Sequence, residues 1–70
     1  MSEELKTSLK IHRAIHNLTQ AELAERIGVT RKSINAIEMG HMVPSTILAL
    51  KLARVLQTSV EQLFALPDVD

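Results

Sequence analysis

Apolar residues recur at helical spacing in two short runs of this chain, separated by a single glycine. In the first run the apolar positions that share one face are Ala21, Leu23, Ala24 and Ile27. Spacing of three or four residues predicts a helix with one buried face. Thr19 and Glu22 fit a threonine-x-x-glutamate capping box, so we expect this helix to begin near Gln20. Gly28 should end it, because glycine readily adopts the left-handed conformation with which a chain leaves a helix.

The second run follows almost at once. Only Val29 separates Gly28 from Thr30, which is a suitable N-cap for another helix. Its inward positions are Ile34 and Ile37. Two helices that meet steeply through a short turn containing glycine form a helix-turn-helix motif, whose second helix can enter the major groove of DNA. The pattern predicts such a motif at about residues 20–39.

A helix is expected before the motif, from about Glu3 or Lys6 to His16. One of its stripes contains Leu5, Leu9, His12 and His16 with Arg13 at its edge, and a second contains Ile11 and Ile15. One stripe should face the core, and the other is free for a partner or for the C-terminal part of the chain. His12 and His16 have the i, i+4 spacing of helical metal ligands. We interpret them as packed imidazoles, because no acid or cysteine joins them and the pattern H-E-x-x-H is absent.

Two more helices are expected after the motif. Ser45 is a natural N-cap for a helix from about Thr46 to Leu56, since Pro44 disfavours helix for the residue before it. Its core positions are Leu48, Ala49, Leu52, Ala53 and Leu56. A fifth helix over residues 60–66 could begin with either of two capping boxes, Thr58 with Glu61 or Ser59 with Gln62. Its core residues are Val60, Leu63 and Phe64.

These elements predict one compact all-α domain of five helices over residues 1–70, with a C-terminal tail from residue 67. The 70 residues contain no repeat, linker or low-complexity tract. They also contain no cysteine, which excludes disulfides and thiolate metal sites. No apolar run resembles a signal peptide or a membrane span, so we expect a cytoplasmic protein without membrane contact.

Charge is unevenly distributed, although the formal net charge is zero. All eight Lys and Arg residues lie between Lys6 and Arg54 with only three acids among them, so this segment carries +5. The other five acids lie near the two ends. A basic middle between acidic ends is typical of a protein with one DNA-binding face. Surplus charge on solvated helix faces is the alternative explanation.

The motif is specific enough to indicate a family. The sequence T-Q-x-E-L-A-x-x-x-G-V-[ST]-R-x-[ST]-I-x-x-I-E-x-G resembles the Cro/repressor-type, or XRE-like, helix-turn-helix family of phage and bacterial transcription regulators. Flanking matches extend the resemblance to about residues 8–64. It implies a lambda-repressor-like DNA-binding domain. Three positions depart from the family pattern: His12 is usually apolar, Met39 is often asparagine and Gln57 is often glycine.

A helix in the major groove reads bases with the side chains at its N-terminal end. Arg31 and Lys32 are placed for this, and the resemblance adds Ala36, which offers only apolar contact. Arginine pairs well with guanine O6 and N7, so we expect guanine in the half-site. Asn35 is a secondary base contact. No metal and no cofactor are expected.

Other side chains should hold the DNA backbone. Gln20 matches the family glutamine that contacts a phosphate, and a helix N-terminus favours an anion there. The remaining candidates are Thr30, Ser33, Arg13, Lys10 and His41. Met39 cannot make the contact of the family asparagine, which then moves to His41 or to the amides of Met42 and Val43. The resemblance also implies that Arg13 pairs with Glu38, tying the first helix to the recognition helix.

Apolar residues exceed what one small core hides, which favours a homodimer. The candidates for its interface are Ile47, Leu50, Val55, Phe64 and Leu66, on the fourth and fifth helices. An interface through Ile11 and Ile15 of the first helix stays open.

The leading hypothesis is a transcriptional regulator, expected to be a repressor that binds a palindromic operator in double-stranded DNA as a dimer. The alternative is an antitoxin-like interaction module whose protein partner binds its apolar surface. We do not expect an enzyme, because the sequence has no glycine-rich phosphate loop and no nucleophile or paired-carboxylate motif.

Overall fold

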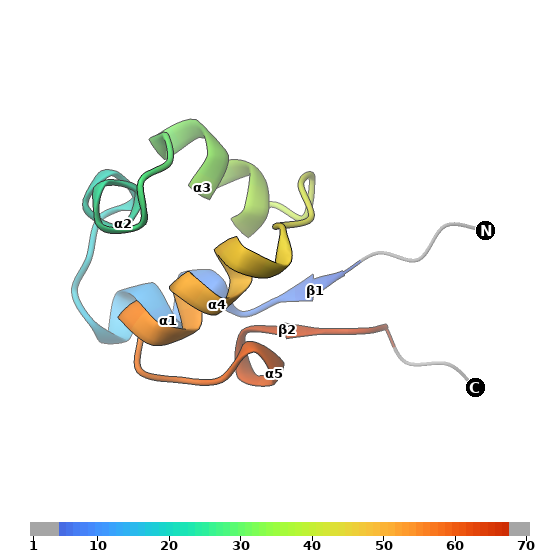
Figure 1. The fold of residues 1–70 in the computed structure, drawn as a ribbon. Helices are drawn as coiled ribbons and strands as arrows, with labels where there is room; N and C mark the ends of the chain where they lie inside the picture. Colours follow the sequence, from blue (N-terminus) through green and yellow to red (C-terminus); the bar gives the residue numbers. More distant parts are fainter. Residues whose placement is uncertain (1–4, 68–70) are drawn as a thin grey trace.

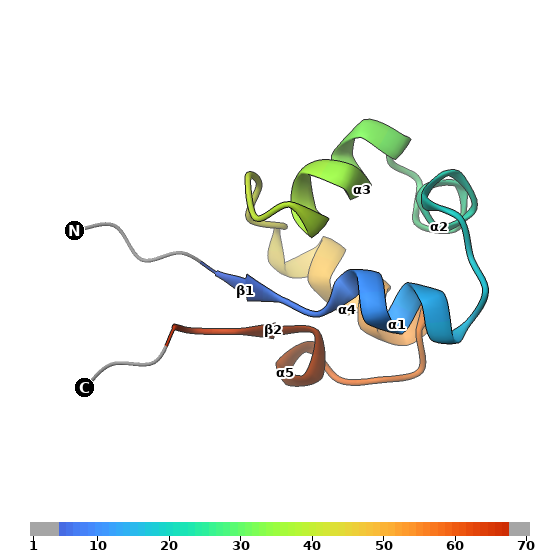
Figure 2. The same ribbon diagram turned by 180° about the vertical axis from the view of Figure 1, so that it is seen from behind.

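The computed structural model describes residues 5–67 and contains five α-helices and two very short strands (Figure 1). In chain order the elements are β1 (Lys6–Thr7), α1 (Leu9–Ile15), α2 (Gln20–Ile27), α3 (Arg31–Glu38), α4 (Thr46–Val55), α5 (Val60–Leu63) and β2 (Phe64–Ala65). α2 packs on α3 and on α4, and α1 contacts α3. Both ribbon views show β1 and β2 running side by side away from the helices (Figures 1 and 2). The five-helix fold expected from the sequence is confirmed.

Side-chain hydroxyl groups cap the N-termini of four of the helices. Thr19 Oγ1 accepts from the backbone N–H of Glu22 at 3.0 Å, and the Glu22 carboxylate accepts from the N–H of Thr19 at 2.8 Å, which completes the predicted capping box. The hydroxyl groups of Thr30 and Ser45 cap α3 and α4 by accepting from a backbone N–H three residues on, without the reciprocal carboxylate bond. At α5 the cap is Ser59, whose hydroxyl accepts from the N–H of Gln62. The local signals in the sequence therefore placed these helix starts correctly.

The first and fifth helices are shorter than predicted. α1 begins at Leu9, because Lys6 and Thr7 pair in antiparallel register with Ala65 and Phe64. α5 ends at Leu63, because Phe64 is extended at φ −133° and ψ 144° and enters β2. The alternative start at Glu3 and the acids of the predicted tail lie outside the described residues. A two-residue ribbon has no periodicity of its own, so nothing local indicates it.

The core lies where α2, α3 and α4 meet and extends to α1 and α5. Its buried apolar residues are Leu9, Leu18, Leu23, Ala24, Ile27, Ile34, Ile37, Leu48, Ala49, Leu52, Ala53, Leu56, Leu63 and Phe64. One predicted core residue, Ala21, is instead exposed, since it lies in the first turn of α2, where the helix has not yet reached the core. No helix among residues 5–67 combines the length and the apolar character that crossing a membrane would need.

Candidate nucleic-acid interface

The geometry of the motif depends on the exit from α2. Gly28 has φ 78° and ψ 34°, in the left-handed region, and its N–H donates to the carbonyl oxygen of Ala24. A Cβ at Gly28 would meet nothing within 4 Å, so the conformation alone favours glycine here. Val29 is half buried, and Thr30 already caps the next helix. The chain thus turns from α2 into α3 over three residues, as the sequence predicted.

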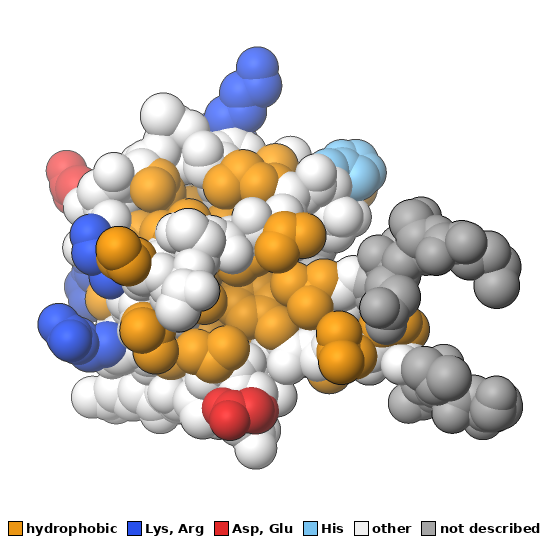
Figure 3. Space-filling model, turned by 45° about the vertical axis from the view of Figure 1, so that its right-hand side comes forward, with side chains coloured by type: hydrophobic (Ala, Val, Ile, Leu, Met, Phe, Trp, Pro, Cys, Tyr) orange, Lys and Arg blue, Asp and Glu red, His pale blue; other side chains and the backbone are white. Residues whose placement is uncertain are grey.

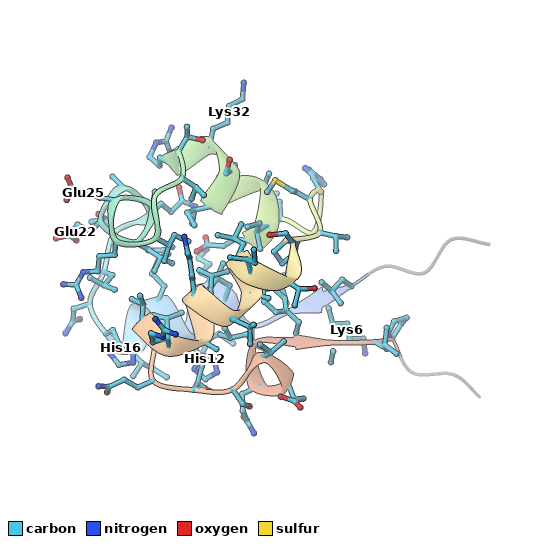
Figure 4. All side chains as sticks on the ribbon, in the orientation of Figure 1. Lys6, His12, His16, Glu22, Glu25 and Lys32 are labelled. Atoms are coloured by element: carbon cyan, nitrogen blue, oxygen red, sulfur yellow. The ribbon has the colours of Figure 1, made fainter. Side chains whose placement is uncertain are left out.

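One face of α3 is buried and the other is open. Ile34 and Ile37 are fully buried on the inner side. Arg31, Lys32 and Asn35 are exposed on the outer side, and we call these three residues the reading face. In Figure 4 Lys32 extends from α3 away from all other elements. The outer side of α3 is therefore free to meet a large ligand.

Two other predicted contact residues on α3 are less accessible, and Thr30 next to α3 is exposed but already hydrogen-bonded. Ala36 and Ser33 are half buried. The hydroxyl groups of Ser33 and Thr30 lie 3.1 Å apart, and Thr30 Oγ1 also accepts from the N–H of Ser33. Thr30 therefore has a structural task as the N-cap of α3.

A bidentate ion pair connects α1 to the end of α3. Arg13 donates from Nε to Glu38 Oε2 at 2.6 Å and from Nη2 to Glu38 Oε1 at 3.2 Å. Its Nη1 donates to the carbonyl oxygen of Leu18 at 2.8 Å. The exposed fractions are 15% for the Arg13 side chain and 4% for that of Glu38. The structure thus forms the pair implied by the resemblance, and it is largely removed from water.

Gln20 connects this ion pair to the reading face. Its Nε2 donates to Glu38 Oε1 at 2.9 Å and to Asn35 Oδ1 at 3.1 Å. Its Oε1 accepts from Arg31 Nη1 at 3.2 Å. The side chain at the start of α2 therefore contacts both ends of α3. The sequence indicated Gln20 as a phosphate contact but gave no signal for these three bonds.

Lys10 and His41 are exposed but lie apart from this network. Lys10 belongs to α1, and His41 follows Gly40 in the loop between α3 and α4. The N–H of His41 donates to the carbonyl oxygen of Ala36, which fixes the start of this loop. Met39, which replaces the family asparagine, is also exposed.

His12 lies on α1 and His16 is the C-cap residue of that helix; Figure 4 labels both at the lower left of the view. Both are half buried, and His16 Nε2 lies 2.7 Å from the carbonyl oxygen of Leu56. A carbonyl oxygen only accepts, so Nε2 carries a proton and donates. Within residues 5–67 no group of three or more His, Cys, Asp or Glu side chains is placed to hold a metal ion. His16 has a structural role that joins the ends of α1 and α4.

The predicted interface residues are divided between surface and core. Ile47, Leu50 and Leu66 have exposed fractions of 68%, 58% and 70%. Val55 is half buried, and Phe64 is only 8% exposed because it packs into the core. Ile11 and Ile15 on α1 are also exposed. Phe64 therefore offers little surface to a partner, whereas three of the five candidates are open to one.

An apolar groove beside α4 was not foreseen. It has a volume of about 520 Å³. It is lined by Leu5, Val43, Pro44, Thr46, Ala49, Leu50, Val60, Glu61 and Phe64, and we call it the α4 groove. Figure 3 shows apolar side chains covering much of this face. Leu5 and Val60 lie far apart in the sequence, which explains why the groove was missed.

A steep two-helix turn with an open recognition helix defines a helix-turn-helix DNA-binding domain. The family model described as helix-turn-helix matches residues 9–63 of the chain. An uncharacterized HTH-type transcriptional regulator of Methanocaldococcus jannaschii is 45% identical over 64 residues, which cover 91% of this chain and 97% of that protein. A Bacillus subtilis protein with the same description is 39% identical over 64 residues, covering 91% and 97%.

Two solved structures are also similar. The clp gene regulator ClgR from Corynebacterium glutamicum superposes with a TM-score of 0.72 at 30% identity, over 77% of this chain and 57% of the ClgR chain. The restriction-modification controller protein C.AhdI from Aeromonas hydrophila gives a TM-score of 0.71 at 30% identity, over 77% and 82%. The chain therefore belongs to the Cro/repressor-type helix-turn-helix family and is a DNA-binding transcriptional regulator.

Proposed function

We propose that this regulator is a repressor that binds a palindromic operator as a homodimer. The observation that carries the proposal is the exposure of Arg31 and Lys32 at the N-terminal end of α3. Side chains at this end of a recognition helix reach base edges when the helix enters the major groove. A protein bound over a promoter needs no further contact to exclude polymerase, which favours repression as the simplest outcome.

Supporting contacts to the DNA backbone come from the residues around the reading face. The first turn of α2, which begins at Gln20, lies next to α3, and its backbone N–H groups favour a phosphate. Lys10 and His41 are exposed and add charge-dependent contacts that do not depend on base sequence. Arg13 acts indirectly, because Glu38 and Leu18 accept from all three of its nitrogens and the side chain is 15% exposed.

A dimer gives the length of site that one short helix cannot read. A single recognition helix contacts only a few base pairs, whereas a twofold pair reads two half-sites about one helical turn apart. Leu50, which lines the α4 groove, and Ile47 on the same helix are both exposed, which favours an interface on α4. Nothing in the comparisons favours the antitoxin-like alternative. The similar proteins come from archaea and bacteria, whose DNA lies in the cytoplasm, so we place the protein there.

Selection of bound duplexes from a random library, followed by titration of the selected duplex at several salt concentrations, tests the proposal. Arg31→Ala with Lys32→Ala should abolish the selected preference. The matched control is Lys51→Ala with Arg54→Ala, which removes two exposed cations of α4. It should leave the preference intact. Selection of a palindrome by the wild type supports the dimer, and failure to enrich any duplex would overturn the proposal.

A further inference from the structure

The amide group of Gln20 has no free donor. Its two Nε2 hydrogens go to Glu38 Oε1 and to Asn35 Oδ1, and its oxygen accepts from Arg31. All three bonds have donor–acceptor distances between 2.9 and 3.2 Å, within the ordinary range. Gln20 therefore connects three side chains, and the donors and acceptors of these side chains restrict the orientation of its amide.

Two of these neighbours require the same orientation of the amide. The Glu38 carboxylate is ion-paired with Arg13 and accepts only, so the NH₂ group of Gln20 must face it. The Arg31 guanidinium donates only, so the amide oxygen must face it. If the Gln20 amide were reversed, its oxygen would face the Glu38 carboxylate and its NH₂ group would face the Arg31 guanidinium, and neither pair can form a hydrogen bond. Because the Glu38 side chain is 4% exposed, water cannot easily replace the lost partner.

The orientation of the Gln20 amide in turn sets the orientation of the Asn35 amide. The oxygen of the Asn35 amide accepts from Gln20, so its NH₂ group faces the other way, on the exposed side of α3. Asparagine recognises adenine by donating to N7 while accepting from N6, which needs both ends of the amide. Here Gln20 takes one of the two lone pairs of the Asn35 oxygen and directs that oxygen toward α2, which makes it less available to the N6 group of adenine. Asn35 then offers donors, as Arg31 and Lys32 do.

We infer that the reading face recognises bases mainly by donating hydrogen bonds, and that Asn35 selects a keto base, guanine or thymine, over adenine or cytosine. Guanine O6 and thymine O4 accept in the major groove, where adenine and cytosine have an amino group. Gln20 and Glu38 are positioning residues for this choice. The inference rests on the proposed function, since it concerns the bases that the bound protein reads.

The experiment is a selection from a random duplex library with the wild type and four variants. Asn35→Ala identifies the operator position that Asn35 reads, because the preference there should disappear. At that position the wild type should favour guanine or thymine by roughly fivefold to a hundredfold over adenine. Gln20→Met keeps the length of the side chain without its amide. With this variant the enrichment of adenine at the Asn35 position should rise to within about twofold of that of the keto bases. The position read by Arg31 should keep its preference for guanine.

Glu38→Gln should weaken the base preference at the operator position that Asn35 reads. An amide at residue 38 can donate as well as accept, so it no longer fixes the orientation of the Gln20 amide. Gln62→Met makes the matched change at an exposed glutamine of α5 and should leave every preference unchanged. Circular dichroism of each variant separates loss of folding from loss of preference. Adenine at the Asn35 position in the wild type, or an unchanged position in Gln20→Met, would overturn the inference and leave the proposed function standing. Failure of the wild type to enrich any duplex would remove both.

Discussion

Arg13 and Glu38, 25 residues apart in the chain, meet as a bidentate pair with an Nε–Oε2 distance of 2.6 Å. The pair ties α1 to the last residue of α3. Glu38 also accepts from Gln20, so one carboxylate connects three helices. Fold stability and the placement of the reading face therefore depend on the same side chain.

Removing one partner of this pair should be strongly destabilising. Glu38→Leu leaves the Arg13 guanidinium largely buried without its counter-charge, and the free energy of unfolding should fall by about 3 kcal/mol. The double variant Arg13→Met with Glu38→Leu should lose clearly less than the sum of the two single losses, because it leaves no unpaired charge. Urea denaturation of the wild type, of Arg13→Met, of Glu38→Leu and of the double variant measures these losses. Additive losses would show that the two residues do not stabilise the fold as a pair.

The capping box of α2 should make stability depend on pH. The backbone N–H of Thr19, followed by its hydroxyl, lowers the pKa of Glu22 below the ordinary value of 4.5. A group whose pKa is lowered by folding stabilises the fold above its unfolded pKa, and this contribution is lost as pH falls through the folded pKa. Glu22→Gln should therefore be less stable than the wild type at pH 7, and the difference should vanish in acid.

Glu25→Gln is the matched control, since it removes an exposed charge from the same helix without touching the cap. Urea denaturation from pH 7 to pH 3 compares the three proteins. A wild-type advantage over Glu22→Gln that persists unchanged at pH 3 would contradict the assignment.

Two helix ends in left-handed conformation should respond oppositely to substitution. Gln57 leaves α4 at φ 53° and Gly28 leaves α2 at φ 78°. A side chain in this region costs roughly 1–2 kcal/mol, and glycine recovers part of it at the expense of unfolded-state entropy. Gln57→Gly should raise the free energy of unfolding by about 0.5 kcal/mol, and Gly28→Ala should lower it by about 1 kcal/mol. Thermal denaturation of both variants measures the change in the free energy of unfolding. A change of the same sign in the two variants would contradict this explanation.

The motif was predictable because its signals are local. The pair Thr19 and Glu22, then Gly28, and then Thr30 each act within about one turn of the helix end that they define, so the sequence shows both the cause and its position. The departure at Gln57 was likewise recognised from one residue. The Arg13–Glu38 pair is long-range and was indicated only through resemblance to a family.

What the sequence missed depends on contacts between distant segments. Thr7 pairs with Phe64 across almost the whole chain, and this pairing shortened both predicted helices. Phe64 of the same strand packs into the core, although the sequence also makes it a candidate for a dimer interface. The bonds of Gln20 require the relative placement of α2 and α3, which helical periodicity does not give. Local patterns thus identify elements, whereas side-chain partners come from their packing.

The location of the dimer interface is the last prediction. If it lies on α4, Leu50→Glu places a charge in an apolar contact and should weaken dimerisation at least about tenfold, because burying an unpaired carboxylate is costly. Ile15→Glu changes an equally exposed residue on α1 and should leave the dimer intact. Analytical ultracentrifugation distinguishes a dimer from the 7.8 kDa monomer. If Ile15→Glu dissociates the dimer and Leu50→Glu does not, the interface lies on α1 instead. A wild type that is monomeric at micromolar concentration would count against a stable dimer in the absence of DNA.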